Sequence, residues 1–334
     1  MTFPYPHKRQ QISLIGLSLV LAACGASTTL PHTAPLPIYA VKNRNVMRYQ
    51  QGHWMSLGDP NPSSMSQPFL TWHQGLYAYD AHQWYRYQTG SWHVVSHWPV
   101  SQLPARNLSN QSPNGMQWVL GSNGRAGCHL GSQPTAAHFY TRHGQAWQPL
   151  PLPAHIEGAA SPAIANNGTI AITVESRCHW LTVVDTAAHH WITIPQPPHT
   201  SAENLLWSPH NHLFLVGLQH VYEYRHHHWV NLRPPLGSGL IDTAAFSPQD
   251  TLALGSRQLL LWHQGRWTIQ ALPAFLPALP GIPHTIEDIT WRAPDQWVMA
   301  TKHLGTLAAW QQGHWHTLST AHAGFTQVVV PSQN

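Results

Sequence analysis

Residues 204–232 read NLLWSPHNHLFLVGLQHVYEYRHHHWVNL, four short runs of strand-forming residues separated by turns. The runs are 204–207, 213–218, 221–224 and 229–232. Apolar and polar side chains alternate in the third run instead of recurring at helical spacing, and proline, asparagine and histidine stand in the turns. The stretch therefore predicts one sheet of four antiparallel strands.

The same unit recurs seven times, and each copy is marked by a tryptophan near the start of its last strand. These tryptophans are separated by 38, 55, 44, 38, 38 and 48 residues. The shortest spacing suits four strands of about 5–6 residues plus turns, and the longer ones add loop insertions. The markers are Trp54, Trp92, Trp147, Trp191, Trp229, Trp267 and Trp315.

The two ends of the repeat region complement each other. Residues 37–40 read as the second strand of a unit whose first strand is missing, and residues 325–330 form a strand with no unit of its own. A last strand that completes the first sheet removes the exposed edges of an open ring. The prediction is an all-β, seven-bladed β-propeller spanning residues 37–331 and closed by its C-terminal strand.

The pattern Trp/Phe-Ser-Pro, strand, strand, turn, Trp resembles the generic β-propeller repeats of bacterial extracytoplasmic proteins. It is distantly similar to WD40 and Kelch units, and residues 184–191 are similar to blades of quinoprotein dehydrogenases and of an outer-membrane assembly lipoprotein. The Gly-Gly pair of Kelch, the Trp-Asp ending of WD40 blades and the Asp-box of sialidases are absent from the repeats. The resemblance thus implies the architecture and carries no activity with it.

The N-terminus reads as a targeting segment. A basic stretch, His7-Lys8-Arg9, precedes a short apolar run at 12–20 and then Leu21-Ala22-Ala23-Cys24. Those last four residues resemble the bacterial lipobox, which implies removal of residues 1–23, acylation of Cys24 and a flexible tether at 24–36. The protein would then be lipid-anchored on the extracytoplasmic face of the cell membrane, or in the outer membrane of a Gram-negative source. An ordinary secretory signal is the alternative.

The composition is poor in charge and rich in histidine. Charged residues make up 8%, there are 27 histidines, and the net charge is only +4 despite a pI near 9.1. So small an excess does not predict a nucleic-acid partner. Because the protein has few carboxylates, little of its folding stability is lost through their protonation as the pH falls. The composition therefore fits a protein exposed to an acidic medium outside the cell, although compositional drift explains the composition equally well.

Two cysteines remain besides Cys24. We expect Cys128 and Cys178 to form a disulfide, with a Cys2His2 metal site or two free thiols as alternatives. The run 226–228, three histidines in a hairpin turn, is expected to be solvated, although it could bind a transition metal adventitiously.

Four carboxylates stand just before or within predicted first strands, which lie innermost in a propeller. Together they could ring one mouth of the central channel and suit a cation or a basic peptide, or they could simply bond turn amides. No residue pattern predicts a catalytic acid–base pair, a nucleophile, or a site for a resident metal or cofactor. The four are Glu157, Glu203, Asp242 and Asp288.

The seventeen tryptophans divide by position. The seven markers are expected to pack between blades, and Trp72, Trp118, Trp207 and Trp291 to be core residues of first strands. Some of the others could be exposed for stacking on sugars or partner side chains: Trp84, Trp98, Trp180, Trp262, Trp297 and Trp310.

The sequence favours a monomeric binding or scaffold lipoprotein whose propeller contacts a protein or glycan. An enzyme with its site at the channel mouth, namely a hydrolase, a lyase or a quinone-type dehydrogenase, is the alternative, because propellers host both kinds of function.

Overall fold

A computed structural model describes most of the predicted propeller. It covers residues 37–331 except for 66, 81–82, 98–105, 112–116, 123–137, 144–145, 154–155, 157, 177–178, 186–189, 198–199, 201–203, 238, 274–285, 294, 302–304 and 320–323. No helix in this part of the chain is long and apolar enough to cross a membrane.

The described residues form 28 strands, arranged in seven sheets of four. The first sheet joins β28 (Phe325–Val329) to β1 (Ile38–Lys42), β2 (Asn45–Gln50) and β3 (His53–Gly58). The second is β4 (Phe69–Trp72), β5 (Leu76–Tyr79), β6 (Gln83–Gln88) and β7 (Ser91–His97). The third is β8 (Arg106–Gln111), β9 (Gln117–Ser122), β10 (His138–His143) and β11 (Ala146–Leu150).

The remaining four sheets follow in chain order. They are β12 (Gly158–Ile164), β13 (Ile170–Ser176), β14 (His179–Asp185) and β15 (Trp191–Pro195); β16 (Asn204–Trp207), β17 (Leu213–Val216), β18 (Val221–Arg225) and β19 (His228–Asn231); β20 (Thr243–Phe246), β21 (Leu252–Gly255), β22 (Leu259–His263) and β23 (Arg266–Gln270); β24 (Ile286–Ala293), β25 (Gln296–Thr301), β26 (Leu307–Gln311) and β27 (His314–Thr317).

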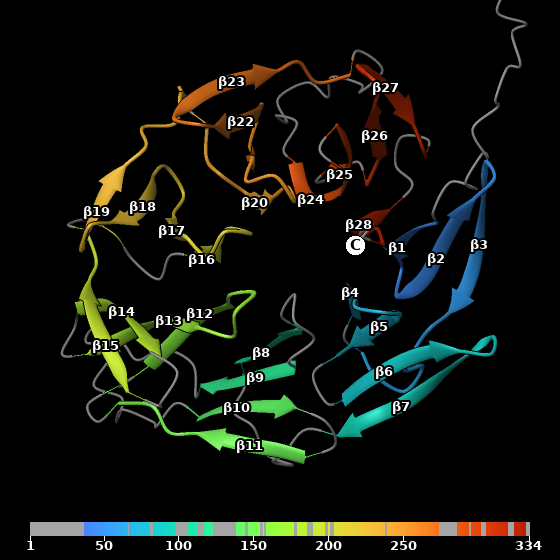
Figure 1. Ribbon diagram of the computed structural model, residues 1–334. Helices are drawn as coiled ribbons and strands as arrows, with labels where there is room; N and C mark the ends of the chain where they lie inside the picture. The colour runs from blue at the N-terminus through green and yellow to red at the C-terminus, as the bar shows by residue number, and fades with distance from the viewer. Residues whose placement is uncertain are drawn as a thin grey trace, which may run out of the picture. The chain divides into compact units, whose positions relative to one another are not determined.

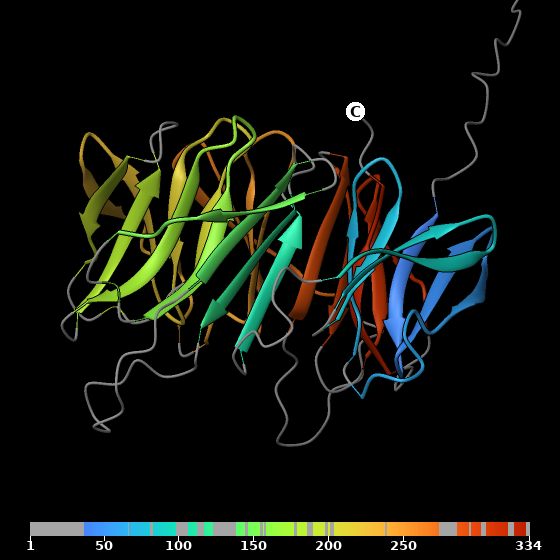
Figure 2. The ribbon, with the colours of Figure 1, turned by 90° about the horizontal axis from the view of Figure 1, so that it is seen from below.

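The seven sheets stand around a central axis as the blades of a propeller (Figure 1). In the side view the strands run between two opposite faces of a short cylinder (Figure 2). The innermost strands are β28, β4, β8, β12, β16, β20 and β24. We call the face at which they end the exit face and the opposite one the entry face.

The C-terminal strand closes the ring, as the sequence predicts. β28 pairs antiparallel with β1, and Tyr39 lies opposite Val329. The centroid of the Phe325 ring lies 4.6 Å from the centroid of the Trp54 ring. The chain therefore enters the first blade on the exit face, because β1 begins where β28 ends.

Turn chemistry follows the prediction in most blades. Asn211 and Asp250, at the ends of Ser-Pro turns, have φ of 63° and 60°, the left-handed conformation that Asn and Asp tolerate.

One strand assignment was wrong. Trp118, expected on a first strand, lies on β9, the second strand of its blade, because the polar segment 106–111 forms the innermost strand.

Each marker tryptophan ties its blade to the preceding one. Its Nε1 donates a hydrogen bond of 2.7–3.0 Å to a backbone carbonyl at or just beyond the end of the preceding outer strand. The seven bonds form a closed circle, since Trp54 of the first blade donates to Leu318 of the last. The acceptors are Leu318, Leu57, His97, Pro151, Pro195, Leu232 and Ala271.

The hydrophobic core is divided among the gaps between neighbouring blades. Between the fifth and sixth blades, for example, Phe214 lies 4.8 Å from the ring of Phe246 and 5.8 Å from that of Trp262. Leu252 and Leu254 fill the same gap and are buried. Each such side chain stabilises the fold by about 1.5–3 kcal/mol, so the blades hold one another in place.

Replacing Trp54 by Phe tests the circle of tryptophan bonds. The aromatic ring stays but the Leu318 carbonyl loses its donor, and an unpaired, partly buried carbonyl costs about 1–3 kcal/mol. We expect Trp54→Phe to lower the free energy of unfolding in urea by at least 1 kcal/mol more than Trp310→Phe. Trp310 is a matched control because it is half-buried, stacks on Trp297 at 5.3 Å, and makes no indole hydrogen bond within the described chain. Equal losses in the two variants would contradict the proposed role of the circle.

Candidate functional site

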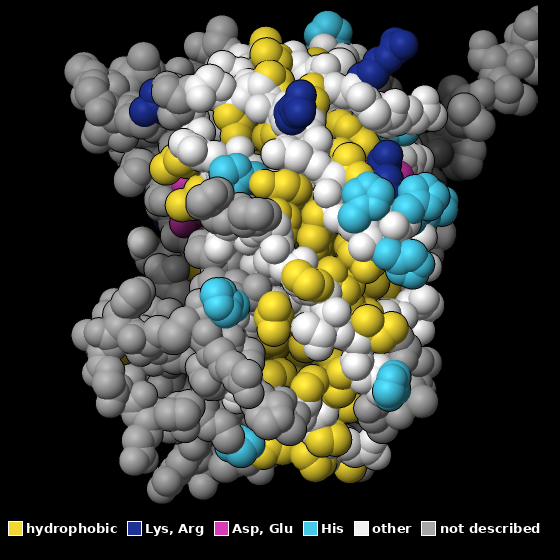
Figure 3. Space-filling view, turned by 90° about the vertical axis from the view of Figure 1, so that its left-hand side faces the viewer, with side chains coloured by type: hydrophobic (Ala, Val, Ile, Leu, Met, Phe, Trp, Pro, Cys, Tyr) yellow, Lys and Arg dark blue, Asp and Glu magenta, His cyan; other side chains and the backbone are white. Residues whose placement is uncertain are grey.

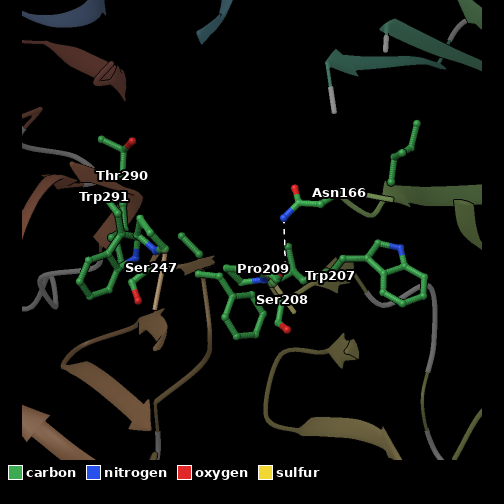
Figure 4. Close-up of a pocket in the computed structure, with 13 residues that line it drawn as sticks. Asn166, Trp207, Ser208, Pro209, Ser247, Thr290 and Trp291 are labelled. Carbon is green, nitrogen blue, oxygen red and sulfur yellow. Dashed lines mark hydrogen bonds between the residues drawn. The ribbon is translucent and has the colours of Figure 1, made fainter. Parts of the chain in front are cut away.

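A cavity of about 550 Å³ opens on the exit face, where the innermost strands of four consecutive blades end. Figure 4 shows side chains from β12, β16, β20 and β24, and from the turns that follow the first three of these strands, around this space. A volume between about 300 and 1,000 Å³ is usual for a ligand site. We call it the exit-face cavity; its lining is Ile164, Asn166, Leu206, Trp207, Ser208, Pro209, Ala245, Phe246, Ser247, Pro248, Ile289, Thr290 and Trp291.

The repeat itself builds this lining. The fifth blade supplies Trp207-Ser208-Pro209 and the sixth supplies Phe246-Ser247-Pro248, at the same place in each unit. In both, the serine amide donates to the carbonyl four residues later, at 2.9 and 2.8 Å. The serine hydroxyl oxygen in turn accepts backbone N–H groups of the turn. An aromatic ring and a proline are thus held rigidly at the mouth.

Two contacts fix the side of the cavity formed by the fourth and fifth blades. Trp207 donates its Nε1–H to the Ala163 carbonyl at 3.2 Å. The Asn166 side chain donates to the Pro209 carbonyl at 3.1 Å, as Figure 4 shows. At the rim, the His210 ring forms a hydrogen bond with the Asp250 carboxylate and links the two Ser-Pro turns. All three contacts cross from one blade to the next.

The lining contains no charged residue among those described. Its faces are aromatic, aliphatic and proline, with hydroxyl and amide groups between them. In the described part of the chain, no group of three or more His, Cys, Asp or Glu side chains is placed to hold a metal ion. Such a lining can pack against apolar groups of a ligand and form hydrogen bonds with its polar ones.

Two of the four predicted carboxylates, Asp242 and Asp288, are described. Asp242 is exposed and directly precedes β20, and Asp288 is the third residue of β24. Glu157 and Glu203 lie outside the described residues. The ring of four acids therefore stays a prediction, and neither described member lines the exit-face cavity.

Asp288 joins the last blade to the closing strand. Its carboxylate accepts a hydrogen bond of 2.9 Å from the Val328 amide of β28. Burial raises the pKa of Asp288 to about 6, although the Val328 and Ile289 amides oppose that rise. On the other side of β28, the Gln327 side chain accepts from the Leu70 amide at 2.7 Å and donates to the Leu70 carbonyl at 3.2 Å. Side chains thus connect innermost strands that share no sheet.

The raised pKa of Asp288 predicts a pH effect on stability. Between pH 4 and 6 the folded state holds a proton that the unfolded state releases, so this contribution is greatest at low pH and is lost as the pH rises through 6. The Asp288→Asn variant keeps an acceptor for Val328 but cannot titrate. Between pH 4 and 7 we expect the free energy of unfolding of the wild type to fall by on the order of 1–2 kcal/mol relative to that of this variant, a value reduced for the partial exposure of Asp288. Urea unfolding of both proteins across that range measures it, and parallel pH profiles would contradict it.

Comparisons with known proteins identify solved structures with a similar fold. No family model and no curated protein matches the chain. Solved structures do: virginiamycin B lyase from Staphylococcus aureus has a TM-score of 0.58 at 11% identity, over 76% of this chain and 85% of that one. YCF48 bound to D1 peptide has a TM-score of 0.56 at 15% identity, over 81% and 87%. A Lactobacillus plantarum protein has a TM-score of 0.56 at 12% identity, over 89% and 99%.

The chain is a seven-bladed β-propeller. At these identities the likeness shows the fold alone, and the similar structures include both a lyase and a peptide-binding protein by their own descriptions. The activity must therefore be argued from this propeller's own side chains.

The tryptophans of the cavity are not those that the sequence marked for exposure. Of that set, Trp84, Trp262 and Trp297 are buried and Trp310 is half-buried. Trp207 and Trp291, expected to be core residues, also line the cavity. The expectation is confirmed for Trp291, which is buried in a core cluster, and Trp207 packs partly buried against another. The recurring Trp/Phe-Ser-Pro at the end of an innermost strand was the signal that could have identified Trp207, whereas Trp291 is followed by Arg292 and Ala293 and carries no such signal.

Other predicted sites fall elsewhere. Cys24, Cys128 and Cys178 lie outside the described residues, so their lipidation and pairing stay predictions. The histidines at 226–228 are exposed in the β18–β19 hairpin, and His226 and His227 have φ of 47° and 65°. Figure 3 shows one flank of the ring, where hydrophobic side chains form a broad band flanked by scattered histidines and few charged groups.

Proposed function

We propose that this protein is a membrane-anchored extracytoplasmic lipoprotein whose propeller binds an uncharged part of a protein or glycan in the exit-face cavity, without catalysing a reaction. The observation that carries the proposal is the lining. Two tryptophans, a phenylalanine and two prolines surround a few hydroxyl and amide groups, with no charged side chain among the described lining residues. Apolar walls with a few placed polar groups are typical of ligand sites.

The route of the chain is compatible with an anchor. The described chain begins at Pro37 on the exit face, next to the end of β28. A tether of residues 24–36 spans at most about 45 Å when fully extended. Lipid on Cys24 would therefore hold the propeller within reach of partners embedded in or attached to the same membrane.

An enzyme is the second candidate, and one observation favours it. The pKa of Asp288, raised to about 6, is of the kind that a general acid or base has. Against this, the carboxylate already accepts the Val328 and Ile289 amides. Asp288 is also not among the residues that line the exit-face cavity, although it directly precedes Ile289, which does.

A charge placed in the cavity tests the proposed function. Thr290 is half-buried on the cavity wall, and Thr193 is exposed on the outer strand β15. We expect wild type and Thr193→Glu to bind the same members of an array of uncharged peptides and oligosaccharides, and Thr290→Glu to bind them at least about tenfold more weakly because of the buried carboxylate. Calorimetric titration of each hit measures the difference. Equal affinity of the two variants, or no hit on either array, would exclude the cavity as the binding site.

The anchor is tested separately in cells. Cys24→Ser removes the acylated side chain, so a processed variant should move from the membrane fraction to the soluble one, because it then carries neither the lipid nor the apolar run at 12–20. Fractionation followed by immunoblotting shows the distribution. Retention of a processed Cys24→Ser protein in the membrane would mean that another segment provides the attachment.

A further inference from the structure

One hairpin of the propeller departs from the rule that the others follow. In the four other described hairpins between the third and fourth strands of a blade, the second turn residue is a glycine with φ of 80–87°. These glycines have open space beside them, so the left-handed backbone, and not crowding, requires glycine there. The four turns are Gln51-Gly52, Thr89-Gly90, Gln264-Gly265 and Gln312-Gly313.

In the fifth blade the two turn residues are His226 and His227, with φ of 47° and 65°. A residue that carries a Cβ atom is less stable than glycine in this conformation. Both side chains are exposed, so packing in the core does not account for them. An imidazole that is kept against the preference of the backbone indicates a functional position.

A continuous set of contacts joins this hairpin to the sixth blade. Arg225, which precedes the turn, forms an ion pair with the buried carboxylate of Glu223. The other oxygen of that carboxylate lies 3.3 Å from Nδ1 of His212. The Arg225 guanidinium also stands over the ring of Trp262 in the sixth blade, at 6.0 Å from its centroid. The charged end of Arg225 is therefore fixed at the boundary between the two blades.

The contacts return to the fifth blade through the Ser-Pro turns. His263 follows Trp262, and its Nδ1 lies 3.2 Å from the Thr251 hydroxyl. The adjacent Asp250 carboxylate forms the hydrogen bond with His210. Figure 3 shows histidine side chains gathered beside a basic side chain toward the right-hand edge of this flank. We call this surface the histidine patch; its exposed basic members are His210, His212, Arg225, His226, His227, His228, His263 and Arg266.

The charge of the histidine patch depends on pH. Above pH 7 its two arginines are balanced by two carboxylates, those of Glu223 and Asp250. Its six histidines add up to about six positive charges as the pH falls to 5, because histidine is the side chain that ordinarily gains a proton in this range. The fourth blade offers little to oppose them, since its outer strand β15 has no titratable residue and Asp185 of β14 is buried. The patch thus changes from nearly neutral to strongly basic.

From these observations we infer that the histidine patch is a second binding site, which takes an acidic segment of a partner protein below about pH 6 and releases it at neutral pH. Carboxylates are the expected ligands because the patch already holds two of its own, those of Glu223 and Asp250. Within the described chain, no carboxylate lies within ion-pair distance of the histidines at 226–228, so these remain available to a partner. The inference goes beyond the proposed function, because no member of the patch lines the exit-face cavity.

An anionic membrane and a metal ion fit the histidine patch less well. Proteins that lie on a membrane through basic residues commonly also place aromatic or aliphatic side chains in the interface. The exposed members of the patch are all histidine or arginine, and its one aromatic ring, Trp262, is only 8% exposed. The described histidines and acids are also not grouped in threes as a metal site needs. An acidic protein segment is therefore the favoured ligand.

A capped hexa-aspartate peptide is the probe, because its carboxylates stay ionised at pH 5. At constant ionic strength we expect the protein to bind this peptide at least about tenfold more tightly at pH 5 than at pH 7.5, and not to bind capped hexa-asparagine. The triple variant His226→Gln/His227→Gly/His228→Gln should lose at least about tenfold in affinity at pH 5. Fluorescence anisotropy of the labelled peptide measures each affinity.

A matched triple variant controls for overall charge. His53→Gln/His314→Gln/His316→Gln removes the same number of exposed histidines from the first and seventh blades, outside the histidine patch. Its affinity at pH 5 should stay within about twofold of wild type, because charges beyond a Debye length are screened.

The single variant His227→Gly separates binding from folding. It restores the glycine of the other hairpins, so its melting temperature should exceed that of wild type by about 1–3 °C. Its affinity for hexa-aspartate at pH 5 should nevertheless fall about two- to threefold, because one of the charges is lost. A gain in stability together with a loss of binding is not expected of a residue with a purely structural role.

Several outcomes would overturn the inference. Equal losses in the two triple variants would mean that overall charge, and not the histidine patch, attracts the peptide. Binding to vesicles of anionic phospholipid but not to hexa-aspartate would identify a membrane as the ligand, and loss of binding in EDTA would identify a bridging metal ion. Absence of hexa-aspartate binding at pH 5 would also overturn it and leave the proposed function standing, since the exit-face cavity is tested with uncharged ligands.

Discussion

The hydrogen bond from a tryptophan Nε1 to the backbone carbonyl of the preceding blade is the interaction on which the ring depends. A four-stranded sheet cannot bury both of its faces alone, so each blade is stable only when its neighbours are in register. The indole combines a large apolar surface with one directional donor. Repeated seven times at 2.7–3.0 Å, it fixes both the distance and the tilt between blades.

This way of joining blades agrees with the low content of charge. The links between neighbouring blades are mostly neutral: the tryptophan bonds, Gln327 with Leu70, and Asn166 with Pro209. Neutral hydrogen bonds are little affected by salt or by titration of carboxylates. Asp288 is a titrating member of this set, and it lies at the junction where the chain closes on itself. The stability of the closure therefore depends on pH more than that of the neutral links.

The two mouths of the channel differ because the repeat is asymmetric along its strands. Each innermost strand begins after an inter-blade connection, where acids such as Asp242 stand, and it ends in a tight turn. In the fifth and sixth blades that turn carries Trp/Phe-Ser-Pro, so aromatic and proline side chains gather on the exit face. The features that close the turns also form the walls of the cavity. A binding site thus arises from the folding motif with few additional residues.

The number of blades and the closure could be predicted from residue patterns, because each unit carries one tryptophan at the same position and a spare last strand matches an incomplete first sheet. The sequence did not reveal β8, whose residues RNLSNQ are polar and have little strand propensity; pairing with β9 decides that strand. The cavity and the raised pKa of Asp288 were also decided by the tertiary structure alone. Both depend on burial by segments distant in the chain, and local residue patterns do not carry that information.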